Sequence, residues 1–132
     1  MQRGISLIEL LIVLAVTGIL AAIAYPGYNE QLRRAARSEV VGLLHDAALR
    51  LESHRARHGR YDDSGQVLAP LPSGNRHYRL HIRRDTATFV LRAERLPSGL
   101  MADDRCGDFQ LDQAGARSNP GSQAAEAGCW GG

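Results

Sequence analysis

Histidine pairs are the side chains whose spacing comes nearest to a metal site. The chain has five histidines. His54 and His58 stand four residues apart in a stretch predicted to be helical, and His77 and His81 could share one face of a strand. Either pair could give zinc two nitrogen ligands, but neither has an evident third ligand and nearby arginines would repel a dication. The pattern favours solvated surface histidines and predicts no metal site.

Aspartates provide a second candidate for chemistry. Asp103, Asp104 and Asp108 could help to bind calcium, although acidic turn residues are the commoner explanation. The sequence contains no nucleophile elbow, phosphate-binding loop or pair of catalytic carboxylates. We therefore expect no enzymatic activity and no cofactor.

Glu9 is the one charged residue in the apolar stretch from Ile5 to Tyr25. A helix over these residues rises about 31 Å, close to the hydrocarbon thickness of a bilayer. Its Leu, Ile and Val residues favour insertion by about 4 to 7 kcal/mol, against a cost of about 2.5 to 3.5 kcal/mol for one carboxylate. The stretch is therefore predicted to span a membrane.

A cleavable secretory signal is the competing explanation for this segment. Such signals have an apolar core of about 7 to 15 residues and end in a cleavable loop. Here the apolar run is longer and continues into an amphipathic helix, so we expect the segment to be retained.

Downstream periodicity predicts an α+β fold. Apolar residues recur every three or four positions at Leu32, Ala36, Val40, Leu43, Ala47 and Leu51, which predicts a helix ending near His58. Val41, Leu44 and Ala48 widen this apolar stripe. The opposite, charged face is expected to be exposed and includes Arg33, Arg34, Arg37, Glu39, Asp46, Arg50, Glu52, Arg55 and Arg57. Alternating runs at 77–84 and 88–95 predict a hairpin, 108–112 a third strand, and 116–118 could add a fourth. We expect one long helix, membrane-spanning and then amphipathic, packed on a small antiparallel sheet of three to four strands.

The start of the chain resembles a known processing signal. The residues that carry the resemblance are Gly4, Ile5, Ser6, Leu7, Ile8 and Glu9, followed by an uncharged span that ends in Ala24, Tyr25 and Pro26. They are similar to the class III signal of type IV prepilins. In that family a prepilin peptidase cuts after the glycine and methylates the new N terminus. The resemblance implies cleavage between Gly4 and Ile5 and methylation of Ile5, where the family usually has Phe.

The resemblance also gives Glu9 a partner, the cationic N terminus of a neighbouring subunit in the fibre. A subunit docked out of register would leave a desolvated charge, at a cost of about 3 to 5 kcal/mol. Alternatively, Glu9 caps its own helix or reaches the lipid headgroups. In assembled pili of this family the stretch bracketed by Gly18 and Pro26 can lose helical hydrogen bonds, and Pro26 should kink the helix because it lacks an amide hydrogen.

The C-terminal stretch CGDFQLDQAGARS, followed by CW, is similar to the tail of minor pilins of the PilE kind. Cys106 and Cys129 lie beyond the predicted span, and a periplasmic location there would favour a disulfide. Closing this loop should contribute about 3 to 4 kcal/mol, which matters for a small core.

The resemblance therefore implies four segments: a removable leader at 1–4, a membrane-spanning and later fibre-core half-helix at 5–26, an amphipathic half-helix at 27–58, and a head at 59–132. We predict a minor pilin subunit that supports pilus assembly, twitching motility and adhesion. It would be a single-pass inner-membrane protein with a periplasmic head until it enters a surface pilus. Expected partners are major and minor pilins, the prepilin peptidase, the inner-membrane assembly machinery and, before assembly, the lipid bilayer.

Three alternatives stay open. All 16 basic residues are arginine, but a net charge of +2 does not by itself imply nucleic acid. A DNA-uptake (competence) pilin could use Arg33, Arg34 and Arg37, or Arg79, Arg83 and Arg84, and its binding would be salt-sensitive. The other two are a type II secretion pseudopilin and a bitopic membrane protein that never polymerises, in which Glu9 would lack its partner.

Overall fold

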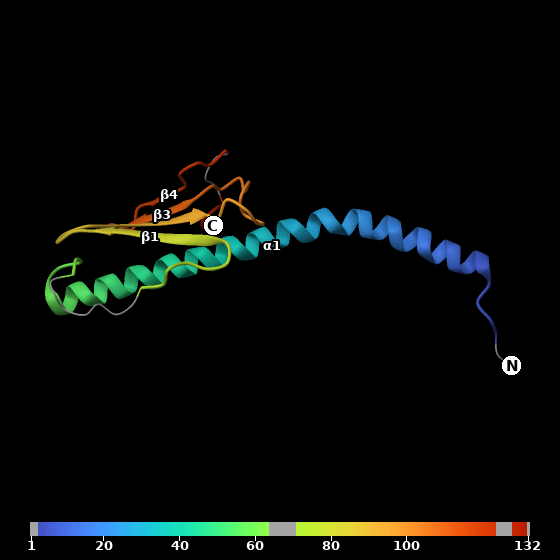
Figure 1. Ribbon diagram of the computed structural model, residues 1–132, viewed down its shortest axis with the longest axis horizontal. Helices are drawn as coiled ribbons and strands as arrows, with labels where there is room; N and C mark the ends of the chain where they lie inside the picture. The colour runs from blue at the N-terminus through green and yellow to red at the C-terminus, as the bar shows by residue number, and fades with distance from the viewer. Residues whose placement is uncertain (1–2, 64–70, 124–127, 132) are drawn as a thin grey trace. The chain divides into compact units, whose positions relative to one another are not determined.

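The computed structural model describes residues 3–63, 71–123 and 128–131 (Figure 1). Helix α1 spans Leu7–His58, and four strands follow: β1 Tyr78–Arg84, β2 Phe89–Arg95, β3 Phe109–Asp112 and β4 Arg117–Ser118. The chain divides into two compact units, Met1–Arg34 and Ala35–Gly132, which we describe separately.

In the first unit, α1 is apolar and solvent-exposed. Its most apolar window has a mean hydropathy of 2.7 and none of it is buried. A soluble core helix can be equally long and apolar, but it buries most of that surface. Tyr25 and Tyr28 are exposed near the end of the apolar run, where aromatic rings suit a membrane interface. The helix continues through Pro26, and the kink at Gly18 and Pro26 stays a prediction.

In the second unit, α1 packs on an antiparallel sheet of strand order β1-β2-β3-β4, as the sequence predicted. Strand alternation places large apolar side chains on one face of the sheet, and they meet the apolar stripe of α1. The core residues of the strands are Tyr78, Leu80, Phe89, Leu91, Ala93, Phe109 and Leu111, and those of the helix are Ala36, Val40, Leu44, Ala47 and Leu51.

The helix stripe differs in detail from the prediction. Leu44, predicted only to widen the stripe, is fully buried, whereas Leu43 is partly buried and Leu32 is 37% exposed. Arg37, predicted on the exposed face, is buried. Tyr61 and Met101 also lie in the core although they belong to no helix or strand, so no periodicity marks them.

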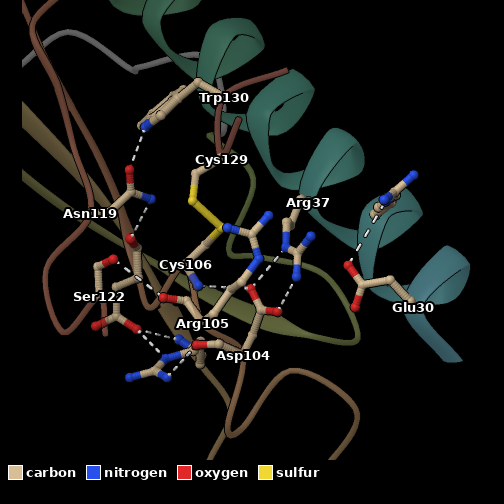
Figure 2. The surroundings of a disulfide bond; sticks show 12 residues. Glu30, Arg37, Asp104, Arg105, Cys106, Asn119, Ser122, Cys129 and Trp130 are labelled. Atoms are coloured by element: carbon tan, nitrogen blue, oxygen red, sulfur yellow. Dashed lines mark hydrogen bonds and ion pairs between the residues drawn. A yellow bond between two sulfur atoms is a disulfide. The ribbon is translucent and has the colours of Figure 1, made fainter. Parts of the chain in front are cut away.

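A disulfide joins Cys106 and Cys129 in this unit (Figure 2). Gly107 follows the first cysteine with φ of 67°, and a Cβ there would lie 2.5 Å from the Pro120 carbonyl oxygen. Only glycine lets the two segments approach this closely. The side chain of Trp130 then packs on Phe109, with ring centroids 5.2 Å apart. The bridge and the ring close the end of the core.

Candidate functional site

Ser6 and Glu9 form a reciprocal cap at the start of α1. The Ser6 amide donates to Glu9 Oε2 over 3.1 Å, and the Glu9 amide donates to Ser6 Oγ over 3.3 Å. This is a capping box, which satisfies two amides that have no partner within the helix. The carboxylate also sits at the positive end of the helix dipole. The first turn is therefore arranged to hold a negative charge.

The cap does not involve the residues that cleavage would remove. Gly4 and Ile5 precede the helix, and Ile5 is 79% exposed. Both hydrogen bonds join Ser6 to Glu9, and the second oxygen of Glu9, Oε1, has no partner in the described part of the chain. Of the alternatives for Glu9, self-capping is thus observed in the single chain. The contact with a neighbouring subunit stays a prediction.

A buried ion pair anchors α1 to the loop before the disulfide (Figure 2). Arg37 donates from Nε to Asp104 Oδ2 over 3.0 Å, and from Nη2 to Oδ1 over 2.5 Å. Asp104 Oδ2 also accepts from the Cys106 amide. Arg37 is 5% and Asp104 2% exposed. The predicted exposure of Arg37 is wrong because a carboxylate 67 residues away satisfies its guanidinium.

Asp108 forms a second charged cluster in the head. Burial would raise its pKa, but the hydrogen bond from the Arg95 amide and those from the Arg92 and Arg95 guanidinium groups outweigh burial and lower that pKa. Asp103 is exposed, so the three aspartates do not converge on one point. Across residues 3–63, 71–123 and 128–131, no three or more metal-ligating side chains gather.

The two predicted histidine pairs, at 54 and 58 and at 77 and 81, lie on different elements of the structure. His54 is largely buried, against the prediction of a solvated surface residue, and its Nε2 lies 3.1 Å from the Asp62 carbonyl oxygen. The His58 ring lies beside it, with centroids 4.6 Å apart. On the sheet, His81 Nε2 contacts Glu94 Oε2 at 2.7 Å. Neither predicted pair meets a third ligand among the described residues.

The solvent side of the sheet carries three exposed arginines, which we call the arginine face: Arg79, Arg83 and Arg92. His81 stands opposite Arg92 in the strand register, between the two arginines of β1. Arg84 lies on the other side of β1 and is only partly exposed. Of the arginines predicted as DNA ligands, Arg79 and Arg83 are therefore presented together, whereas Arg37 and Arg84 are not.

Two family models cover most of the chain. One, described as a prokaryotic N-terminal methylation motif, matches residues 1–25. The other, described as the type IV minor pilin ComP, DNA uptake sequence receptor, matches residues 26–110, well over half of the chain. The chain belongs to the type IV pilin family. In this pilin the long helix precedes the sheet, which is the order implied by the resemblance of its N-terminal signal and C-terminal stretch to those of pilins.

Individual relatives agree with this assignment. The type IV major pilin protein PilE1 of Neisseria gonorrhoeae is 38% identical over 64 residues, which are 48% of this chain and 39% of that protein. This pilin thus spans about two fifths of the length of such curated relatives. A type IV pilin from Shewanella oneidensis aligns with a TM-score of 0.51 at 26% identity, over 70% of this chain and 97% of the other.

A second solved structure extends the likeness in fold. The non-core minor pilin PilV of Neisseria meningitidis aligns with a TM-score of 0.56 at 20% identity, over 72% of this chain and 93% of the other. At this identity the likeness concerns the fold alone. The helix packed on a four-stranded antiparallel sheet is therefore a shared pilin scaffold.

Proposed function

We propose that this pilin is a minor subunit of a type IV pilus, cut between Gly4 and Ile5, methylated at Ile5, and inserted into the fibre through the first half of α1. The observation that carries the proposal is that the methylation motif matches residues 1–25, where the apolar side chains of the first part of α1 are all exposed. A single chain leaves that surface in water at a large cost in free energy. Lipid before assembly, and other pilin helices afterwards, would cover it.

The four segments follow from this proposal. Residues 1–4 are the leader that a prepilin peptidase removes, 5–26 span the inner membrane and later form the fibre core, 27–58 continue the helix, and 59–132 form the head. The head faces the periplasm before assembly, because the Cys106–Cys129 disulfide is stable in an oxidising compartment. Assembly machinery in the inner membrane would then move the subunit from lipid to fibre.

Minor rather than major status is supported by the description of the family model over residues 26–110. PilE1, by contrast, is described as a major pilin. We propose contributions to pilus assembly, twitching motility and adhesion, all of which are structural rather than catalytic. Separately removing the major pilin and this chain, and then comparing surface fibres, distinguishes the two roles.

Glu9 is the residue that we propose sets the register of assembly, by pairing with the N terminus of a neighbouring pilin. Glu9→Gln tests this, because glutamine at this position still completes a capping box but carries no charge. We expect the share of the chain in fibres sheared from the cell surface to fall more than about tenfold, since the fibre amine would lose its partner. The processed chain in the membrane should stay at its usual level.

The matched control is Glu39→Gln, the same change at an exposed position of α1 in the second unit. It should enter fibres normally. Normal entry of Glu9→Gln would remove the proposed contact. Absence of the unaltered chain from fibres would favour the bitopic membrane protein that never polymerises.

DNA binding is a second candidate function, supported by two independent observations. The matching family is described as a DNA uptake sequence receptor, and the arginine face presents exposed guanidinium groups at Arg79 and Arg83. Guanidinium groups on a sheet suit phosphate contacts. Glu94 and Asp108 reduce the charge of the same region, since they contact His81 and Arg92. The proposal therefore assigns phosphate contacts to Arg79 and Arg83 first.

A further inference from the structure

A histidine lies at the centre of the arginine face. On β1, Arg79, His81 and Arg83 occupy alternate positions and are all exposed. Their side chains therefore leave the sheet on the same side, about 7 Å apart along the strand. Arg92 of β2 is also exposed and stands directly opposite His81 in the register. Three permanently charged side chains thus flank one whose charge depends on pH.

The charged groups that face His81 come from both strands. Arg92 and the two arginines of β1 oppose a proton on its ring, whereas Glu94 favours one, since its Oε2 lies 2.7 Å from His81 Nε2. Asp108 offsets part of the charge of Arg92, which it binds over 2.9 Å. His77 precedes β1 on the same side, beyond the first arginine. The side chains of His81 and Glu94 are 48% and 55% exposed, so a dissolved anion can reach this pair.

Protonation changes what the His81 ring can bind. The neutral ring has one N–H donor and no charge, whereas the protonated ring has two donors and a positive charge. The protonated ring can therefore keep one N–H on Glu94 and give the other to a phosphate. Phosphates of one DNA strand follow each other every ~3.4 Å of duplex axis. Side chains about 7 Å apart along a strand can thus each reach a phosphate of their own.

We propose that His81 is a third phosphate-binding residue of the arginine face, which acts only when its ring is protonated, so that the head binds DNA more tightly in mildly acidic solution. The inference rests on the second candidate function, in which Arg79 and Arg83 contact DNA phosphates. It adds one residue and a dependence on pH. By linkage, a bound phosphate also favours the protonated ring, so binding takes up a proton.

The experiment measures the affinity of the full chain in detergent for a labelled duplex, over a range of salt, at about pH 5.5 and about pH 8, where histidine differs in charge. We expect the slope of log affinity against log salt to be steeper by about one at the lower pH, for one added phosphate contact. His81→Gln should show the shallower slope at both pH values, and His81→Arg the steeper slope at both. The control is His58→Gln on the exposed surface of α1, which should keep the difference between the two pH values.

Three results would contradict the inference. Equal slopes of the natural chain at the two pH values would exclude a contact that depends on protonation. A difference that persists in His81→Gln would assign the effect to another histidine, such as His77. In both cases DNA binding through Arg79 and Arg83 would stand. A natural chain that binds no duplex at either pH would instead remove the DNA function itself, and the inference with it.

Discussion

Arg37 and Asp104 form an ion pair whose loss should strongly affect the stability of the head. Both side chains are buried, and the guanidinium group matches the carboxylate with two parallel hydrogen bonds. A buried pair of this kind adds little beyond an apolar pair of equal volume, but either partner alone is an uncompensated buried charge. The pair therefore matters most through what happens when it is broken.

Arg37→Ala should lower the free energy of unfolding of the head by about 3 to 5 kcal/mol, because it leaves Asp104 buried without its cation. The measurement is urea denaturation of the full chain in detergent, followed by the fluorescence of Trp130, the single tryptophan. Arg50→Ala is the control, since Arg50 pairs with Asp46 on the exposed surface of α1. Such exposed pairs contribute about 0.3 to 0.5 kcal/mol. Equal losses in the two variants would contradict the structural role of Arg37.

Asp108 should make the free energy of unfolding of the head depend on pH. Its pKa in the folded chain is lowered, so the folded state favours the ionised carboxylate. The resulting stability is present above the unfolded pKa of about 3.9 and is lost as pH falls through the lower folded value. In denaturation curves between about pH 5 and pH 2, Asp108→Asn should be less stable than the natural chain at the upper end, and the difference should shrink toward the lower end. A constant difference would exclude this linkage.

Among the structural elements, the C-terminal segment closed by the disulfide contains the shortest strand. Strand β4 has only two residues, Arg117 and Ser118. The segment is held by side chains beyond the strand. Trp130 Nε1 donates to Asn119 Oδ1 (Figure 2), and Asn119 Nδ2 donates to the Asp108 carbonyl. The cysteines are 23 residues apart, so the bridge closes a loop that contains β3 and β4.

Replacing both Cys106 and Cys129 by serine should therefore destabilise the head by about 3 to 4 kcal/mol, the loop-closure value for this separation. The same denaturation assay measures it. Reduction of the natural chain with dithiothreitol should lower the urea midpoint by a similar amount and should leave the double variant unchanged. A double variant as stable as the natural chain would show that the segment holds without its bridge.

The helix and the strands could be located from the sequence because each leaves a local periodicity of apolar residues. The end of α1 at His58 and the strands at 78–84 and 89–95 follow the apolar pattern closely. Burial of Arg37 and Asp104 had no local sign, because each is satisfied by a residue far along the chain. Tyr61 was missed for a related reason: its ring packs on Phe89 from a segment without regular structure. At the N terminus, Ser6 and Glu9 stand three residues apart and could have been read as a capping box.

At the scale of the whole molecule, charge is distributed unevenly although its sum is small. The net charge is +2, while two buried acids of the head, Asp104 and Asp108, are engaged with Arg37, Arg92 and Arg95. The guanidinium groups of Arg79 and Arg83 remain on the solvent side of the sheet. A weakly charged pilin can thus still present a local cationic surface.

If that surface binds DNA, Arg79→Gln with Arg83→Gln should weaken binding of the full chain in detergent to a labelled duplex. The slope of log affinity against log salt should become shallower by about two, one for each lost phosphate contact. Arg50→Gln with Arg57→Gln on α1 changes the net charge equally and should leave that slope unchanged. Equal effects of both pairs would indicate attraction by net charge alone, and no binding by the natural chain would remove DNA as a ligand.

The most direct test of the account is the intact mass of this chain recovered from sheared surface fibres. We predict a polypeptide that begins at Ile5 with one N-terminal methyl group and that contains the Cys106–Cys129 disulfide. A chain that keeps Met1 to Gly4, or that is found only in membranes while fibres form without it, would contradict its role as an assembled pilin subunit.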